Sequence, residues 1–397
     1  HPGAAGWTEE AMASTGAANV WSIISADPER DLVFLPTGSA APDFYGGERP
    51  GRNDYANSVV ALRASTGEVV WSFQVVHHDL WDYDVASQPL LLELERDGGP
   101  VPAVVVGTKM GHLFVLHRET GEPLFPIEER PVPGSDIPGE EAWPTQPFPT
   151  LPAPLHSAAL TPDEAFGIDD EDLAFCRDWI EGLRYDGIFT PPSLEGTIIW
   201  PGFAGGMNWD GMAWDPGRQM LVVPVKRLAM FVQLHERADF EAGLEDPEDG
   251  LEYSRQGGTP YGMTRMPMLS PKGIPCSPPP WSKLMGVDLS DGSLVWERPL
   301  GGMPDAPQEW GSVSFGGPLT TAGGVTFIAA GQDDHIRAYS TASGEVLWEA
   351  KLPAGGQAAP MSYRYQGRQY LVIAAGGRGG IGTAGDYIVA FALPDGG

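Results

Sequence analysis

A hairpin pattern that recurs at a spacing near fifty residues constrains the fold of this chain more than any other feature. Each copy is an apolar strand, a tight turn that contains glycine, and a second strand that ends in an aromatic residue. The turn glycines are Gly67, Gly121, Gly292 and Gly344, which are 54, 171 and 52 residues apart. Hairpins repeated at this period predict the blades of a β-propeller. A β-sandwich whose hairpins are alike by chance is the alternative.

Two stretches interrupt the pattern. Residues 122–200 are rich in proline and acidic residues, and we expect an insertion over one face of the propeller, with one or two short helices within 163–183. Residues 234–280 are irregular, and we expect a long loop there. Neither stretch has the features of a separate domain, so residues 1–397 are interpreted as a single propeller domain.

The composition narrows the class of protein. The formal net charge of −29 argues against binding to nucleic acid or to an anionic membrane surface. Glycine (52) and proline (39) are abundant while charged residues make up only 19%, which favours strands and turns over helices. The two cysteines, Cys176 and Cys276, allow one intrachain pair, either as a disulfide or as two buried thiols.

Residues 77–84 concentrate three carboxylates, two imidazoles and an indole directly after an alternating strand at 69–76. This density of titratable groups at a strand end indicates a functional site. The alternative is an acidic loop whose tryptophan fills a gap in the core. A zinc site is weakly supported, because no third ligand has a suitable spacing. The glycine run at 376–380 lacks the strand-to-helix context of a nucleotide-binding loop, so we reject that function.

Short segments along the chain carry a resemblance to a known family. They are residues 19–22, 35–38, 42–47, 76–82, 187–193, 260–262, 273–276, 352–357 and 385–394. These segments resemble the dehydrogenases that depend on pyrroloquinoline quinone (PQQ), and most closely their membrane-bound glucose, polyol and quinate dehydrogenase branch. The resemblance implies an all-β, eight-bladed propeller with PQQ on its axis, located in the periplasm. This chain would supply about five to six blades, and the N-terminal blades would come from another segment or chain.

The resemblance also implies roles for individual residues. Trp21 would be the indole floor under the planar cofactor. Asp82 would be the general base that takes the proton of the substrate hydroxyl while hydride moves to the quinone, a role that a raised pKa favours. Lys109 would donate a hydrogen bond to a quinone oxygen, and Asn208 and Trp310 are expected cofactor contacts. Without the resemblance, Trp21 would be read as a packing residue between blades and Lys109 as an exposed turn lysine.

Positions at which the sequence departs from the family pattern indicate candidate residues for binding the metal and the substrate. The family places Ca²⁺ or Mg²⁺ beside PQQ. Here Ser39 stands in place of a ligating asparagine, and Asp43 is nearby, so these two are the metal candidates. His77 and His78 are expected either to orient the base or to line the substrate pocket. Arg378 stands where the sugar-oxidising branch has histidine, and a guanidinium there would favour a carboxylate-bearing substrate such as quinate.

These expectations lead to one functional prediction and two alternatives. The prediction is PQQ-dependent oxidation of a sugar, polyol or cyclic hydroxy acid, with electrons passed to a quinone or another acceptor because the chain has no CxxCH haem motif. A periplasmic location would favour a disulfide between Cys176 and Cys276 that links the insertion to the later loop. The alternatives are a non-catalytic propeller scaffold, and a glycosidase propeller that uses Asp79, Asp82 and Asp84.

Overall fold

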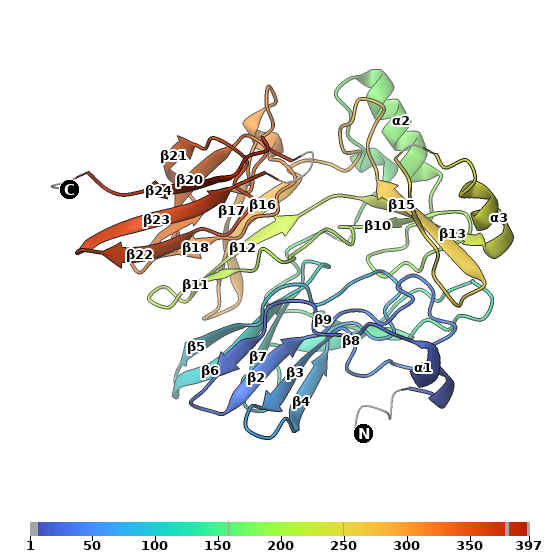
Figure 1. Cartoon of the computed structure of the whole chain (residues 1–397), viewed down its shortest axis with the longest axis horizontal. Helices are drawn as coiled ribbons and strands as arrows, with labels where there is room; N and C mark the ends of the chain where they lie inside the picture. The colour runs from blue at the N-terminus through green and yellow to red at the C-terminus, as the bar shows by residue number, and fades with distance from the viewer. Residues whose placement is uncertain (1–6, 158, 249, 378–380, 395–397) are drawn as a thin grey trace. The chain divides into compact units, whose positions relative to one another are not determined.

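The computed structural model describes residues 7–157, 159–248, 250–377 and 381–394. The chain divides into two compact units, and each is described by itself. The first unit consists of residues 1–91, 102–206 and 227–278, and the second of residues 92–101, 207–226 and 279–397. Strands dominate both units, as Figure 1 shows. The prediction of an all-β chain is therefore confirmed.

The first unit begins with a four-stranded antiparallel sheet in the order β1-β2-β3-β4. Its strands are β1 (Ser25–Asp27), β2 (Leu32–Pro36), β3 (Ser58–Arg63) and β4 (Val69–Gln74). The short helix α1 (Glu9–Ser14) precedes this sheet. The turn between β3 and β4 contains Gly67 at φ +74°, a conformation that glycine adopts without steric cost. This sheet is the first of the hairpin repeats predicted from the sequence.

Further sheets follow in the chain. Strands β5 (Leu90–Arg96), β6 (Gly99–Gly107) and β7 (Leu113–His117) form a sheet in this order, of which residues 92–101 are assigned to the second unit. The first unit also contains the antiparallel pair β8 (Ile127–Pro131) and β9 (Thr145–Pro149), and a sheet in the spatial order β10 (Thr197–Ile199), β13 (Met230–Glu236), β15 (Tyr261–Pro267) and β14 (Glu252–Ser254). The 3₁₀-helix η2 (Pro162–Glu164) and the helix α2 (Asp170–Glu181) lie within the stretch predicted to carry short helices.

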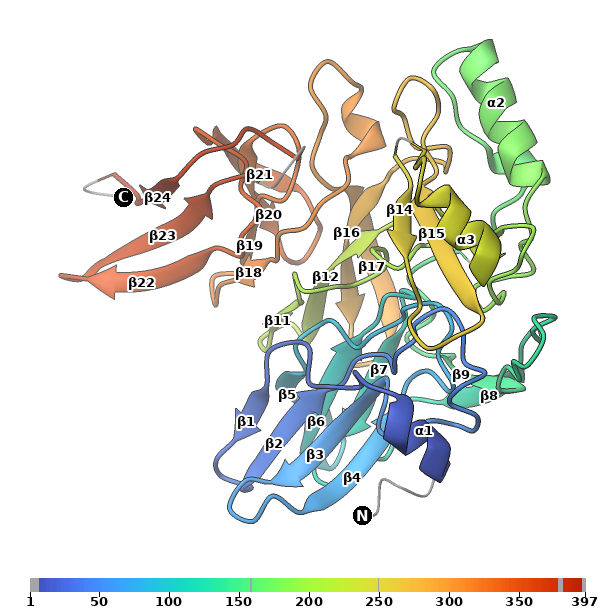
Figure 2. The same cartoon turned by 45° about the vertical axis from the view of Figure 1, so that its right-hand side comes forward.

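The prediction that residues 234–280 form a long irregular loop is wrong, because the stretch contains regular secondary structure. The stretch contains the helix α3 (Arg237–Gly243) and the strands β14 and β15, which lie beside one another in Figure 2. Phe240 of α3 is buried, and Gly262 of β15 leaves the space that its ring occupies. The first four residues of β15 are all buried, so the strand lacks the polar and apolar alternation by which a half-exposed strand is recognised.

The second unit contains two four-stranded antiparallel sheets and one three-stranded sheet. Their strands, in spatial order, are β11 (Ala213–Asp215), β12 (Met220–Lys226), β16 (Ser282–Asp288) and β17 (Ser293–Pro299); β18 (Leu319–Thr320), β19 (Val325–Ile328), β20 (His335–Ser340) and β21 (Val346–Lys351); and β22 (Met361–Tyr365), β23 (Arg368–Ala375) and β24 (Tyr387–Phe391). The 3₁₀-helix η3 (Gln308–Trp310) lies between the first two of these sheets in the chain.

One contact explains the spacing of glycine and tryptophan in the repeats. The ring of Trp71 lies against Gly121 of the next hairpin, where a Cβ atom would come within 2.6 Å of the indole. Trp296 lies in the same way against Gly344, with a corresponding distance of 2.5 Å. Each indole nitrogen also donates a hydrogen bond to a backbone oxygen of the following hairpin. The repeated aromatic residue therefore packs one hairpin on the next, and glycine is the residue that leaves room for it.

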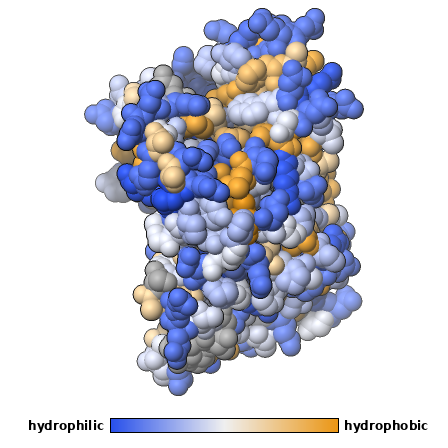
Figure 3. All heavy atoms as spheres, turned by 90° about the vertical axis from the view of Figure 1, so that its right-hand side faces the viewer, coloured by the Kyte–Doolittle hydropathy of each residue, from blue (hydrophilic) through white to orange (hydrophobic). Residues whose placement is uncertain are grey.

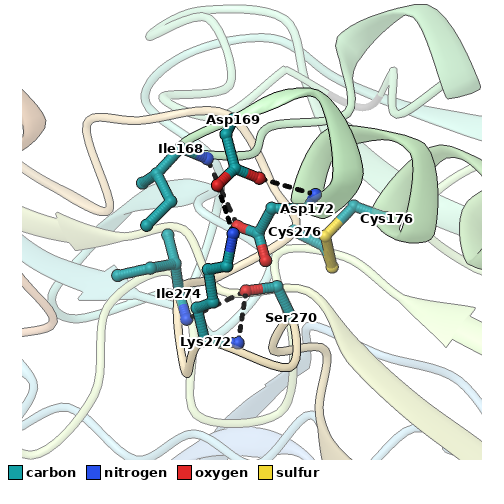
Figure 4. Close-up of a disulfide and its surroundings, with 8 residues drawn as sticks. All are labelled: Ile168, Asp169, Asp172, Cys176, Ser270, Lys272, Ile274 and Cys276. Carbon is teal, nitrogen blue, oxygen red and sulfur yellow. Dashed lines mark hydrogen bonds and ion pairs between the residues drawn. A yellow bond between two sulfur atoms is a disulfide. The ribbon is translucent and has the colours of Figure 1, made fainter.

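A disulfide joins α2 to the segment that follows β15. Figure 4 shows the bond between Cys176 and Cys276. Their Cα atoms are 5.1 Å apart. Asp169, the N-cap of α2, accepts a hydrogen bond from the Asp172 backbone N–H at 3.0 Å and pairs with Lys272 of the same later segment. The predicted pairing of the two cysteines is confirmed.

The surface agrees with the composition. Hydrophilic side chains cover most of the face drawn in Figure 3. Within the described part of the chain, the structure contains no helix that is both long enough and apolar enough to cross a bilayer.

Candidate active site

The loop at 77–84 is organised by Asp79. Its Oδ1 accepts a hydrogen bond from the Trp81 backbone N–H at 3.1 Å, and its Oδ2 accepts from the Tyr83 backbone N–H at 2.9 Å. Oδ2 also accepts from the side chains of Asn57, at 3.0 Å, and Ser39. Asp79 is buried, and burial raises the pKa of its carboxyl. Since all of these bonds are internal to the fold, Asp79 shapes the loop and is not placed to act on a substrate.

Trp81 and Tyr83 anchor the loop in the core of the first unit. The Trp81 indole nitrogen donates to the Thr190 carbonyl at 2.7 Å, and the Tyr83 hydroxyl donates to the Ile188 carbonyl at 3.0 Å. Both rings also pack against Phe189, with centroids 5.1 and 6.0 Å away. Trp81 therefore fills the core, as the structural alternative predicted for this tryptophan. The neighbouring carboxylates make other contacts.

Asp82 and Asp84 meet the buried side chain of Lys109. The Lys109 Nζ lies 2.9 Å from Asp82 Oδ1, 2.7 Å from the Asp82 carbonyl oxygen and 2.7 Å from Asp84 Oδ2. An ammonium group has three hydrogens, so these bonds occupy all of its donors. Lys109 is 1% exposed, so it is not the exposed turn lysine of the alternative reading. Its predicted hydrogen bond to a quinone oxygen would require one of the three bonds to open.

The backbone holds this cluster in a defined geometry. Asp82 has φ +58°, a left-handed conformation that aspartate tolerates better than most residues. Asp84 Oδ1 accepts a hydrogen bond from the Ser39 backbone N–H at 2.5 Å. Gly38 permits this approach, because a Cβ atom there would come within 2.6 Å of Asp84 Oδ1. The glycine of the 35–38 segment therefore has a steric role at the site.

The pKa values of Asp82 and Asp84 are shifted in opposite directions. Burial raises the pKa of Asp82 well above its usual range, and the negative charge of Asp84 adds to this effect despite Lys109. Burial acts in the same direction on Asp84, but the charge of Lys109 and its hydrogen bonds outweigh it and lower the pKa of Asp84. Asp82 is thus the carboxylate that takes up a proton more readily, which is the property that a general base requires.

Trp21 lies beside this cluster with its ring open to solvent. The side chain is 42% exposed, and the Lys109 Nζ is 5.1 Å from the centroid of the indole ring. An exposed aromatic face next to a buried cation and a basic carboxylate suits a planar, anionic cofactor. The residues that the structure brings together here, Trp21, Asp82 and Lys109, therefore fit PQQ. Asp84 completes the cluster, and the sequence indicated it only as a candidate acid of the glycosidase alternative.

The two histidines of the loop are buried and bonded elsewhere. The ring nitrogens of His77 lie 2.8 Å from Gln74 Oε1 and 3.0 Å from Glu129 Oε1. His78 Nδ1 lies 2.7 Å from the Gly51 carbonyl, and burial lowers the pKa of His78 to about 3. None of the hydrogen bonds described for these two rings reaches Asp82. The geometry therefore favours a role for both in holding the loop, rather than the predicted role at the base or in the substrate pocket.

Three further residues were predicted to contact the cofactor or the substrate. Asn208 and Trp310 belong to the second unit. Asn208 Oδ1 accepts a hydrogen bond from the Trp209 backbone N–H at 2.9 Å, and the ring of Trp310 packs against Trp281 at 5.9 Å. Their contact with PQQ stays a prediction. Arg378 lies outside the described residues.

The metal candidates do not form a recognisable ion site. Ser39 Oγ already donates to Asp79 and accepts from Asn57 Nδ2 at 3.1 Å. Burial, followed by the charges of Asp79 and Asp84, raises the pKa of Asp43. In the ranges that the structure describes, no three His, Cys, Asp or Glu side chains gather in a way that could hold a metal ion. The expected Ca²⁺ or Mg²⁺ and its ligands therefore stay a prediction.

One residue at the site was missed in the sequence. Arg265 of β15 reaches Asp82, with its Nη1 3.5 Å from Asp82 Oδ2. The two residues are 183 positions apart in the chain, and no local pattern marks Arg265. Only its position on a strand could have drawn attention to it, and that strand was predicted to be a loop.

Solved structures identify the fold. The quinohemoprotein alcohol dehydrogenase from Comamonas testosteroni matches with a TM-score of 0.64 and 23% identity, over 95% of this chain and 48% of that one. The repeated four-stranded antiparallel sheets are thus those of a quinoprotein β-propeller, and the predicted fold class is confirmed.

The family follows from the sequence comparisons. The family described as "PQQ: Glucose/ethanol/alcohol dehydrogenase, beta-propeller domain" matches residues 1–371, and the chain belongs to it. The quinoprotein glucose dehydrogenase of Escherichia coli (strain K12) is 41% identical over 405 residues, covering 98% of this chain and 51% of that protein. A probable quinate dehydrogenase (quinone) of Xanthomonas campestris pv. juglandis is 39% identical over 394 residues, covering 95% and 50%. The chain spans about half the length of these curated relatives.

Proposed function

We propose that this chain provides the Trp21, Asp82 and Lys109 part of the active site of a PQQ-dependent dehydrogenase that oxidises a secondary or hemiacetal hydroxyl. The observation that carries the proposal is the cluster itself. A solvent-open indole lies 5.1 Å from an ammonium that is bonded to a carboxylate of raised pKa. A propeller scaffold without catalysis has no need of this arrangement, and family membership supports the choice of cofactor.

The protein residues have separate tasks in this proposal. When bound, PQQ would accept the hydride. Trp21 would support the plane of the cofactor by stacking. Asp82 would take the hydroxyl proton on Oδ2, because Lys109 already holds Oδ1 at 2.9 Å. Lys109 would keep both carboxylates in place and compensate their charge in a site with little water.

The substrate class, acceptor and location are parts of the same proposal. Relatives named for glucose and quinate support a polyhydroxylated sugar, polyol or cyclic hydroxy acid, and Arg378 would favour a carboxylate-bearing member of that group. A relative named as a quinone-linked enzyme supports electron transfer to a quinone. The disulfide supports the periplasm, an oxidising compartment. We further propose that another segment or chain supplies the remaining blades.

The test combines cofactor binding with turnover. PQQ should quench tryptophan fluorescence in the purified protein, and dye-linked assays with glucose, glycerol and quinate should then identify the substrate. Asp82→Asn should bind PQQ with nearly unchanged affinity and lose roughly 10²-fold or more in kcat. Asp291→Asn, which changes an exposed turn carboxylate of the second unit, is the control. Near-normal turnover of Asp82→Asn would refute the role of the base. Absence of PQQ binding by the wild type, when it is assembled with the remaining blades, would favour the scaffold.

A further inference from the structure

Arg265 approaches the Asp82 carboxylate from a different sheet than Lys109. It lies on β15, which pairs with β14 so that Glu252 is directly opposite Arg265. Lys109 lies in the turn between β6 and β7. The Nη1 atom of Arg265 is 3.5 Å from Asp82 Oδ2, while the Lys109 Nζ is 2.9 Å from Oδ1. Each oxygen of the Asp82 carboxylate is therefore contacted by a different cationic side chain.

Three contacts restrict the guanidinium of Arg265. Its Nε and Nη2 donate to the two carboxylate oxygens of Glu252 at 2.9 and 2.7 Å, a bidentate geometry that fixes the plane of the group. The same plane lies over the ring of Phe203, with the central carbon 4.3 Å from the ring centroid, and 5.7 Å from that of Phe44. These contacts leave Nη1 as the nitrogen that faces Asp82.

The two cations hold Asp82 with unequal strength. The Lys109 contact is a short hydrogen bond from a buried ammonium, whereas the Arg265 contact is at the limit of hydrogen-bond distance. Both side chains of the longer contact remain partly open to solvent, Arg265 being 20% and Asp82 18% exposed. The contact at Oδ2 is thus the weaker of the two, and Arg265 limits the directions in which the carboxylate can point.

We propose that Arg265, held by Glu252 and Phe203, is a positioning residue that orients the Asp82 carboxylate for proton transfer at Oδ2. The inference rests on the proposed function, in which Asp82 is the general base. It assigns no contact with substrate or cofactor to Arg265. A purely structural ion pair between Arg265 and Glu252 would stabilise the β14 hairpin but would have no effect on Asp82.

The test compares four variants of the full protein. Arg265→Gln removes the cation, and Arg265→Lys keeps the charge without the bidentate group. Glu252→Gln leaves Arg265 in place but weakens its support. Arg255→Gln is the matched control, because Arg255 makes a similar two-oxygen contact with Glu241 at 2.8 and 2.9 Å on the surface. Thermal unfolding, PQQ binding, kcat and KM are measured for each variant.

A readout that needs no activity comes from the cofactor-free protein. The Asp82 carboxyl is followed by carbon-13 NMR after labelling of aspartate, and its signal is assigned by its loss in Asp82→Asn. The charged groups that act on Asp82 are Lys109, Asp84, Asp43 and Arg265. Removal of Arg265 takes away one of the two positive charges, so the titration midpoint of Asp82 should move upward by about half a pH unit or more in Arg265→Gln.

The expected pattern is specific to a positioning role. Arg265→Gln should lower kcat by about tenfold while PQQ affinity changes by less than about threefold. Arg265→Lys should restore the titration midpoint and part of kcat, Glu252→Gln should lower kcat by a smaller factor, and Arg255→Gln should resemble the wild type. If Arg265→Gln does not fold, Glu252→Gln and Arg265→Lys decide by the same criteria.

Two results would overturn the inference. One is an unchanged kcat and an unchanged Asp82 midpoint in Arg265→Gln. The other is a loss of kcat that follows the loss of thermal stability and is not recovered by lysine. A wild-type protein without PQQ-dependent turnover would instead refute the proposed function, and the titration of Asp82 would still show whether Arg265 acts on that carboxylate.

Discussion

Removal of the Lys109 ammonium should destabilise the protein strongly, and more at neutral than at acidic pH. Lys109 is 1% exposed and makes three bonds to Asp82 and Asp84. Lys109→Met would leave the buried carboxylate of Asp84 and the partly buried carboxylate of Asp82 without their nearest counter-ion. Loss of one partner of a buried ion pair typically costs about 3–5 kcal/mol in free energy of unfolding. For a chain of 397 residues this corresponds to a decrease in Tm of about 4–6 °C.

The pH dependence follows from the carboxylates. In the wild type, Lys109 helps to lower the pKa of Asp84 in the folded state, so the stability from this contact is present above the unfolded-state pKa and is lost as the pH falls. In Lys109→Met, burial and mutual repulsion should raise both folded-state pKa values above the unfolded ones. The resulting penalty is absent when both groups are protonated and grows as the pH rises. The difference between wild type and variant should therefore be larger at about pH 8 than at about pH 5.

Thermal unfolding monitored by tryptophan fluorescence at the two pH values measures this difference. Lys283→Met is the matched control, because Lys283 pairs with Glu297 at a similarly short distance of 2.8 Å, but Glu297 is 48% exposed. Such a solvent-exposed pair contributes about 0–1 kcal/mol. The reasoning fails if Lys109→Met costs no more stability than Lys283→Met, or if its cost does not change with pH.

Three further predictions concern separate parts of the molecule. Trp21→Ala should weaken PQQ binding by roughly tenfold through loss of stacking, and an unchanged Kd in a fluorescence titration would remove Trp21 from the cofactor site. Joint replacement of Cys176 and Cys276 by serine should lower the free energy of unfolding by about 2–5 kcal/mol, because the bond closes a loop of 100 residues, and PQQ affinity should not change. Arg378→His should lower the ratio of quinate to glucose turnover, and an equal ratio in both proteins would contradict the carboxylate clamp.

The repeats could be recognised in the sequence because a steric contact requires particular residue types at the repeated positions. A tryptophan that lies on the backbone of the next hairpin requires glycine at that position, as Trp71 does on Gly121 and Trp296 on Gly344. Both residues of the contact therefore recur at a fixed spacing in the sequence. The strand β15 was missed for the opposite reason. Its buried residues include Gly262 and Thr264, which mark neither a hydrophobic run nor an alternation.

The location of the site was predictable from the loop at 77–84, but the roles of its residues were not. His78 and Asp82 have φ values of +45° and +58°. Both residues lie in the loop that follows β4, where no strand alternation sets the directions of successive side chains. As a result His77, His78 and Asp79 are bonded within the fold, while Asp82 and Asp84 face Lys109. Composition reveals the density of titratable groups, and only backbone geometry assigns them to the core or to the site.

The charge balance at the site also explains why two adjacent carboxylates are useful there. A general base is charged before it takes a proton and neutral afterwards. A buried cation that was paired only with the base would therefore be left unpaired whenever the base was protonated. Asp84 avoids this, because its Oδ2 holds the Lys109 ammonium at 2.7 Å and its pKa is lowered. Within the proposed function, Asp84 keeps Lys109 paired while Asp82 is protonated. In the Asp-x-Asp sequence of residues 82–84, Asp82 is thus the base and Asp84 is the permanent counter-charge of Lys109. A single carboxylate could not perform both tasks.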